Sequence, residues 1–98
     1  MSEEKLNNLL ETVKLFKIYS DLTRLRIIEL LTHGELCVQD ISDELDTSQS
    51  AISHQLKMLR DMNVVKTRKQ GKQVFYCMQD NHVREIFQIG YDHITECN

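Results

Sequence analysis

The chain has 98 residues, no proline, three glycines, 41% hydrophobic residues and a net charge of −3, which predicts one small domain over residues 1–98 without a flexible linker. No apolar stretch resembles a signal peptide or is long enough to cross a bilayer, so we expect a cytoplasmic protein with no membrane partner. Three widely separated cysteines, Cys37, Cys77 and Cys97, argue against a disulfide framework and favour a reducing compartment.

The positive charge is concentrated in one segment of an otherwise acidic chain. Residues 1–53 carry five basic and ten acidic groups, residues 54–76 carry six basic and one acidic group, and residues 77–98 carry one basic and four acidic groups. A basic patch can dock on phosphate while the acidic remainder is repelled, so the charge pattern imposes an orientation. Segment 54–76 is therefore a candidate surface for nucleic acid, although a solvated charged face is the usual origin of such a run.

The N-terminal part predicts two helices. Apolar residues at helical spacing indicate an amphipathic helix over residues 5–19, and Asp21 can cap a second helix that stops near Gly34. A chain this small buries little apolar surface, and dimerisation through its terminal helices, residues 1–19 and 81–98, would relieve that shortage, so we expect a homodimer. The apolar residues of the first helix are Leu6, Leu9, Leu10, Val13 and Phe16.

Two short helical patterns separated by a turn follow over residues 38–62, which is the helix-turn-helix arrangement. The second helix turns its apolar stripe to the core and its polar residues outward. Short hydrogen-bonding side chains near its start suit base edges, and cations further along suit phosphates. The residues expected to contact DNA are Ser48, Gln49, Ser50, Ser53, His54, Lys57 and Arg60.

Residues 64–78 predict a β-hairpin, because β-prone residues flank the turn Gln70-Gly71-Lys72. The hairpin carries Arg68, Lys69 and Lys72, so it can act as a wing that reaches the DNA backbone or minor groove beside the second helix. The sequence therefore predicts a mainly α (α+β) fold, a winged helix-turn-helix with about five helices and a two-stranded wing, with double-stranded DNA as a partner.

The last helix, expected over residues 82–97, carries candidate metal ligands at both ends. His82 and His93 are about three helical turns or roughly 16 Å apart, so they share a face but cannot share one metal ion. In an antiparallel pair of these helices, His82 would meet the second chain's His93, and Asp80 would meet its Glu96. Both pairings are centred near Phe87 and Gln88, so one two-fold axis there would build two identical sites. Asp80 is equally a natural helix N-cap, and Gly90 predicts that a neighbouring helix, from the first segment or the second subunit, passes close by.

Four segments resemble the ArsR/SmtB family of bacterial metal-responsive repressors, and the resemblance covers essentially the whole chain. Asp80-x-His82 with His93-x-x-Glu96 is similar to the site on the final helix of the zinc and cobalt sensing branch, and the family implies the same sharing between subunits. The four segments are residues 21–27 (DLTRLRI), 34–38 (GELCV), 48–56 (SQSAISHQL) and 71–76 (GKQVFY).

Two imidazoles and two carboxylates suit zinc, cobalt or nickel, and a closed set of four ligands favours tetrahedral zinc or cobalt. His33 and His54 are expected to be surface or capping residues rather than ligands. The resemblance implies that the metal-free dimer blocks transcription of a gene for metal export or sequestration. Metal binding would then fix an angle between the subunits at which the two second helices no longer match the operator.

Two alternatives stay open. The first is a repressor switched by oxidation of Cys37, Cys77 or Cys97. As a metal site, Cys37 with Asp40 is only half of the family's thiolate site, since Gln39 stands where thiolate-rich members have a second cysteine. The second is a metallohydrolase, which uses the same ligand types but needs an open position for water that four protein ligands do not leave. We therefore expect no enzymatic activity.

Overall fold

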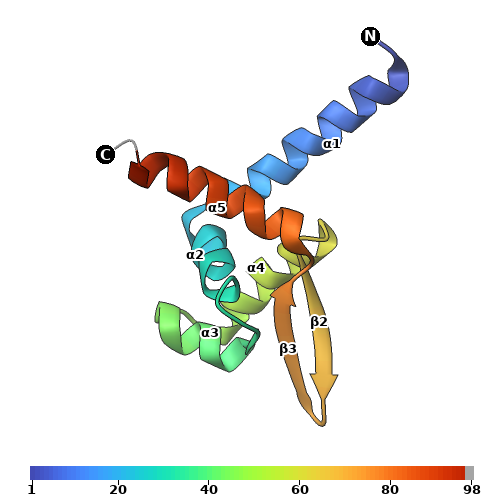
Figure 1. Ribbon diagram of the computed structural model, residues 1–98. Helices are drawn as coiled ribbons and strands as arrows, with labels where there is room; N and C mark the ends of the chain where they lie inside the picture. The colour runs from blue at the N-terminus through green and yellow to red at the C-terminus, as the bar shows by residue number, and fades with distance from the viewer. Residues whose placement is uncertain (97–98) are drawn as a thin grey trace.

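The structure is a computed structural model and describes residues 1–96, which form five α-helices and three β-strands (Figure 1). The number of helices agrees with the sequence prediction. Within this part of the chain, no helix is both long and apolar enough to cross a membrane. The elements in order are α1 (Glu3–Tyr19), α2 (Leu22–Leu31), β1 (Leu36–Cys37), α3 (Val38–Leu45), α4 (Gln49–Asp61), β2 (Val65–Gln70), β3 (Gln73–Met78) and α5 (Asn81–Glu96).

Side chains fix where four of the helices begin. Ser2, Asp21, Ser48 and Asp80 each accept a hydrogen bond from the backbone N–H three residues further on, over 3.0–3.1 Å. These caps satisfy N–H groups that have no partner inside a helix, which stabilises each first turn by about 1 kcal/mol. The turn between α3 and α4 passes through Asp46, whose left-handed backbone (φ 50°) ends α3.

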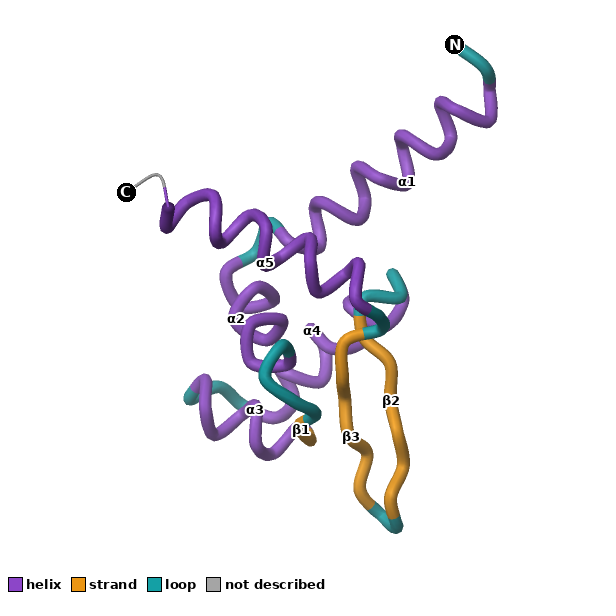
Figure 2. Tube along the Cα trace, in the orientation of Figure 1, coloured by secondary structure: helices purple, strands orange, loops and turns teal. Residues whose placement is uncertain are grey.

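The core lies between α2, α3, α4, the sheet and the first half of α5. Among residues 1–96, Ile18 is the only residue of α1 buried in this core, and Leu15 and Tyr19 pack partly against it. The rest of α1 projects away from the body, and the hairpin of β2 and β3 projects in another direction (Figure 2). The largest fully buried side chains are Ile27, Ile28, Leu31, Ile41, Ile52, Leu56, Leu59, Val64 and Val65.

The wing is a three-stranded antiparallel sheet with the strand order β1-β3-β2. β2 pairs with β3 from Val65 opposite Met78 to Gln70 opposite Gln73, and Gly71, with φ 62°, supplies the left-handed backbone of the tight turn. β1 adds two pairs, including Leu36 opposite Tyr76. The sequence predicted only two strands, because a strand of two residues is too short to show any alternation of polar and apolar residues.

Candidate DNA-binding surface and metal-binding helix

α4 presents its polar face to solvent because its apolar face is buried. Ile52, Leu56 and Leu59 are fully covered by the core. The seven residues predicted on this helix and its cap to contact DNA are all exposed: Ser48, Gln49, Ser50, Ser53, His54, Lys57 and Arg60.

The exposed residues of α4 differ in how far they are already engaged. The Ser48 hydroxyl accepts the N–H of Ala51 and therefore acts first as the helix cap. Lys57 pairs with Asp61 one turn further along, with Nζ 3.0 Å from Oδ2. Within residues 1–96, the side chains of Ser50, Ser53, His54 and Arg60 have no hydrogen-bond partner. Of these, Ser50, Ser53 and His54 lie in the first half of α4 and stay candidates for contact with base edges.

The cations of the wing also differ in whether they already have a partner in the structure. The guanidinium of Arg68 donates two hydrogen bonds to the carboxylate of Glu35, one of them over 3.1 Å, and lies 5.1 Å from the centre of the Phe75 ring. The hydrogen bond from Arg68 lowers the pKa of Glu35. Lys69 and Lys72 are exposed and have no ion pair within residues 1–96. Arg68 is thus already paired with an acid, unlike Lys69 and Lys72, and the predicted contact of all three with DNA stays a prediction.

α5 carries three of the four predicted metal ligands, Asp80 lies just before it, and all four are exposed. At its start, Asp80 Oδ1 lies 3.1 Å from His82 Nδ1 and also accepts the N–H of Val83. His93 and Glu96 lie at the other end of the helix. Within residues 1–96, no three metal-binding side chains come together in one chain. The spacing of His82 and His93 on α5 likewise predicts that one chain alone cannot build a complete site. The site shared between two chains stays a prediction.

The thiols form no cluster in this part of the chain. Cys37 and Cys77 are free, and Cys37 Sγ lies 3.2 Å from Asp40 Oδ2. Cys97, the third candidate for a redox switch, lies outside the described residues.

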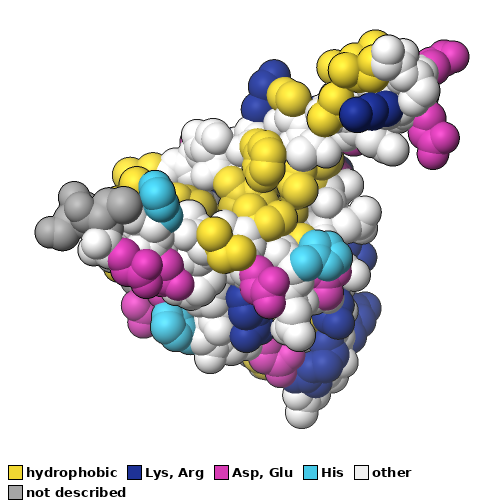
Figure 3. Space-filling view, turned by 45° about the horizontal axis from the view of Figure 1, so that its top comes forward, with side chains coloured by type: hydrophobic (Ala, Val, Ile, Leu, Met, Phe, Trp, Pro, Cys, Tyr) yellow, Lys and Arg dark blue, Asp and Glu magenta, His cyan; other side chains and the backbone are white. Residues whose placement is uncertain are grey.

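A large apolar surface is exposed where α1 meets α5 (Figure 3). The apolar stripe of α1 (Leu6, Leu9, Leu10, Val13 and Phe16) is 45–53% exposed along its whole length. Next to it is a groove of about 390 Å³, whose walls include Tyr19, Leu25 and Ile94. On α5 itself, Ile89, Tyr91 and Ile94 are all more than half exposed. Isolated soluble chains rarely expose so much contiguous apolar surface.

Gly90 also lines this groove, but a Cβ atom built on it would meet nothing within 4 Å. Within residues 1–96, no other element therefore contacts this position, and of the two expected neighbours, the first segment and a second subunit, the structure shows no close approach by the first. The pattern on α5 could not separate an approach within the chain from one by a second subunit, and the second possibility stays a prediction.

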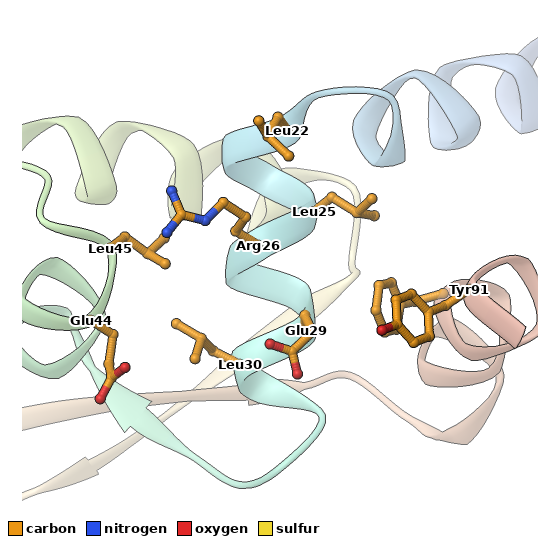
Figure 4. Close-up of a pocket in the computed structure, with 9 residues that line it drawn as sticks. Leu22, Leu25, Arg26, Glu29, Leu30, Glu44, Leu45 and Tyr91 are labelled. Atoms are coloured by element: carbon orange, nitrogen blue, oxygen red, sulfur yellow. The ribbon is translucent and has the colours of Figure 1, made fainter. Parts of the chain in front are cut away.

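A second groove, of about 360 Å³, lies between α2, α3 and α5 (Figure 4). Glu29 of α2 and Glu44 of α3 lie on either side of Leu30, and Arg26 projects toward Leu45. The residues that line it include neither an imidazole nor a thiol. This groove adds nothing to either predicted site.

Comparison with known proteins places the chain in a family. The sequence profile described as "Bacterial regulatory protein, arsR family" matches residues 21–67. The chain is 38% identical, over 88% of its length and 65% of the relative's, to "Transcriptional repressor SmtB homolog" of Synechocystis sp.. It is 37% identical, over 91% of its length and 74% of the relative's, to "Cadmium resistance transcriptional regulatory protein CadC homolog" of Staphylococcus aureus. Both relatives are regulators of transcription by name, not enzymes.

Solved structures share the whole architecture. HlyU from Vibrio cholerae matches with a TM-score of 0.82 at 33% identity, and the match covers 100% of each chain. The homodimeric winged helix-turn-helix domain Mb0332 from Mycobacterium bovis matches with a TM-score of 0.88 at 23% identity, over 98% of this chain and 93% of that one. The predicted winged helix-turn-helix fold is therefore confirmed. On the relatives and on this fold together, the chain belongs to the ArsR family of bacterial regulatory proteins.

Proposed function

We propose that this chain is a metal-responsive transcriptional repressor, whose metal-free dimer binds operator DNA and releases it when zinc or cobalt binds between the subunits. The observation that carries the proposal is the exposed polar face of α4 beside the cationic wing, on a chain whose last helix holds two imidazoles and two carboxylates at its ends. The names of the SmtB and CadC relatives support a repressor that responds to metal.

The DNA-binding surface would combine two kinds of contact. Ser53 and His54 are exposed near the start of α4, where a recognition helix enters the major groove. Lys69 and Lys72 would bind phosphates from the wing and thereby set the position of the protein on the duplex. The acidic N-terminal and C-terminal parts would be repelled by the same phosphates, so only one face of the protein would approach DNA.

The dimer would form over the apolar stripe of α1 and the exposed apolar residues of α5. A second copy is the natural occupant, because a symmetric dimer covers the same surface on both chains. The geometry of α5 adds support, since only an antiparallel copy supplies each histidine with further ligands.

The donor set of α5 fits a borderline divalent metal. Asp80 Oδ1 accepts the N–H of Val83 and lies 3.1 Å from His82 Nδ1, so the carboxylate and the imidazole already lie side by side at the start of α5. Two ligands from one chain would therefore be available together to one metal ion. Bound zinc or cobalt would cross-link the two α5 helices, and the protein's part is to present Asp80 and His82 from one chain opposite His93 and Glu96 from the other.

A fluorescence titration tests the proposal. Duplex DNA from upstream of the chain's own gene is titrated with the protein alone and with zinc, cobalt or nickel. We expect specific binding by the metal-free protein and release by zinc and cobalt, and we expect His93→Ala protein to bind normally but to resist release. If the protein binds no specific sequence, the proposal that it is a repressor is wrong. Binding that responds to peroxide or alkylation, but not to metal, would replace the metal switch by a cysteine switch.

A further inference from the structure

Arg24 connects three helices through one nearly buried guanidinium group. Its side chain is only 14% exposed. From α2, Nε donates to the carbonyl of Ile18 over 2.9 Å and Nη2 donates to the carbonyl of Lys17 over 3.2 Å, both in the last turn of α1. Nη1 donates to Oε1 of Gln55 in α4 over 3.1 Å and lies 3.7 Å from the sulfur of Met58.

The end of α1 is a favourable place for this cation. The last carbonyls of a helix have no partner inside it, and the negative end of the helix dipole attracts positive charge. The guanidinium is planar and its donors are in a fixed fork, so three acceptors held together also fix the directions of the groups that carry them. Arg24 is itself anchored, because its backbone N–H is the donor to the Asp21 cap.

The link to α4 lies directly behind the proposed DNA-binding face. Gln55 is half-buried and follows His54 in the sequence, so the hydrogen bond from Arg24 acts on the rotation of α4 about its own axis. The apolar contacts of α4 with the core are not directional. Among residues 1–96, α1 meets that core only through Ile18 and the partly buried Leu15 and Tyr19 near its end, so apolar packing alone gives little control over the angle between α1 and α4.

We propose that Arg24 is a positioning residue for operator recognition, which fixes the angle between α4 and the end of α1. This inference rests on the proposed function, in which α1 forms part of the dimer interface. If α1 is held by its partner, the angle between α1 and α4 sets the distance between the two α4 helices. Half-sites one helical turn apart are about 34 Å from centre to centre, so a small change in this angle moves α4 off its groove.

The test measures tolerance to half-site spacing, which a purely structural role would not change. Wild-type protein first selects an inverted repeat from a random duplex library. The affinity of each variant is then measured on that repeat and on versions with one base pair added to or removed from the centre. Arg24→Lys keeps the charge, but a single ammonium group cannot hold both carbonyls and Gln55 in the same fixed geometry.

We expect Arg24→Lys to bind the selected repeat roughly tenfold more weakly, the size expected for one hydrogen bond to a charged group. We also expect its preference for the original spacing over the altered ones to shrink, and its affinity for random DNA to stay unchanged because the charge is kept. Gln55→Met removes the acceptor on α4 without touching α1, so it should shift the spacing profile in the same direction.

Arg26→Lys is the matched control. Arg26 is exposed on the same helix and projects toward Leu45 on another side of α2 (Figure 4), so its replacement should leave the spacing profile as in the wild type. Sedimentation and thermal unfolding establish which variants remain folded dimers. Should Arg24→Lys fail to fold, Gln55→Met carries the test alone.

Two results overturn the inference. One is a wild-type spacing preference in a folded Arg24→Lys dimer and in Gln55→Met. The other is an equal loss of affinity at every spacing, which would make Arg24 only a stabiliser of the fold. If wild-type protein selects no sequence at all, the proposed function itself has failed, and this outcome is distinct from both.

Discussion

The hydroxyl of Tyr19, the last residue of α1, donates a hydrogen bond of 2.7 Å to the carbonyl of Val83 in the first turn of α5. Burial raises the pKa of Tyr19 to about 12, and the negative charge of Asp80 acts in the same direction. The end of α1 is thus held on two sides. Arg24 links it to α4, and Tyr19 links it to the turn of α5 that carries Asp80 and His82.

Tyr19→Phe should lower the free energy of unfolding by about 1 kcal/mol, the usual net worth of one hydrogen bond. The wild type should also lose stability as the pH rises from about 10 toward 12, because the unfolded tyrosine ionises near 10 while the folded one still holds its proton. Urea unfolding across this range should show a smaller decline for Tyr19→Phe. Tyr91→Phe is the control, since the Tyr91 hydroxyl makes no hydrogen bond within residues 1–96. An identical decline in the wild type and in Tyr19→Phe would assign it to other groups.

A mixed dimer tests whether metal sites are shared between subunits. If His82 of one chain and His93 of the other bind the same ion, a dimer of one His82→Ala chain and one His93→Ala chain keeps one complete site and loses both histidines from the other. Each homodimer of a single variant would have two sites that lack a histidine. Cobalt absorption should therefore report one tetrahedral site in the mixed dimer and none in either homodimer. A mixed dimer with no site would show that the ligands are assigned wrongly.

Lys69 and Arg68 are neighbouring cations of the wing, and we expect them to contribute differently to DNA binding. Lys69→Gln should weaken binding to operator and random DNA alike and reduce the salt dependence by about one unit for the lost phosphate contact. Arg68→Gln should change that slope less, because Glu35 already neutralises Arg68. The plot of log K against log salt concentration gives both values. A larger change for Arg68 than for Lys69 would mean that the Glu35 pair opens on DNA.

If α4 contacts bases, its variants should lose DNA affinity in a different pattern from the variants of the wing. Ser53→Ala should lower affinity for the selected operator more than for random DNA, because a base contact carries sequence information and a phosphate contact does not. Ser48→Ala is the informative comparison. It removes a cap, so we expect it to cost about 1 kcal/mol of stability, seen by urea unfolding. Equal losses on both kinds of DNA would make Ser53 a residue that only positions the helix.

Much of the architecture could be predicted from the sequence because it depends on local patterns. The helical spacing of apolar residues and the capping side chains predict the five helices, and the turn at Gly71 predicts the hairpin. The features that were missed depend on residues far apart in the chain. The partner of Arg68 is Glu35 across the sheet, and Arg24 and Gln55 each look like ordinary polar residues of an amphipathic helix. A partly buried arginine cannot be told from a solvated one until the helices are placed.

The last prediction concerns the apolar stripe of α1, which no other part of the described chain covers. Val13→Asp should turn the proposed dimer into single chains at micromolar concentration, because it places a charge where apolar contact with a second copy is expected. Specific DNA binding should fall with it, since one α4 helix alone contacts only half of an inverted repeat. Thr12→Asp is the matched control, for Thr12 is β-branched, exposed and adjacent but lies outside the stripe. Sedimentation at several concentrations measures both variants. A stable dimer of Val13→Asp would exclude the α1 stripe from the interface and leave α5 as the surface on which the subunits meet.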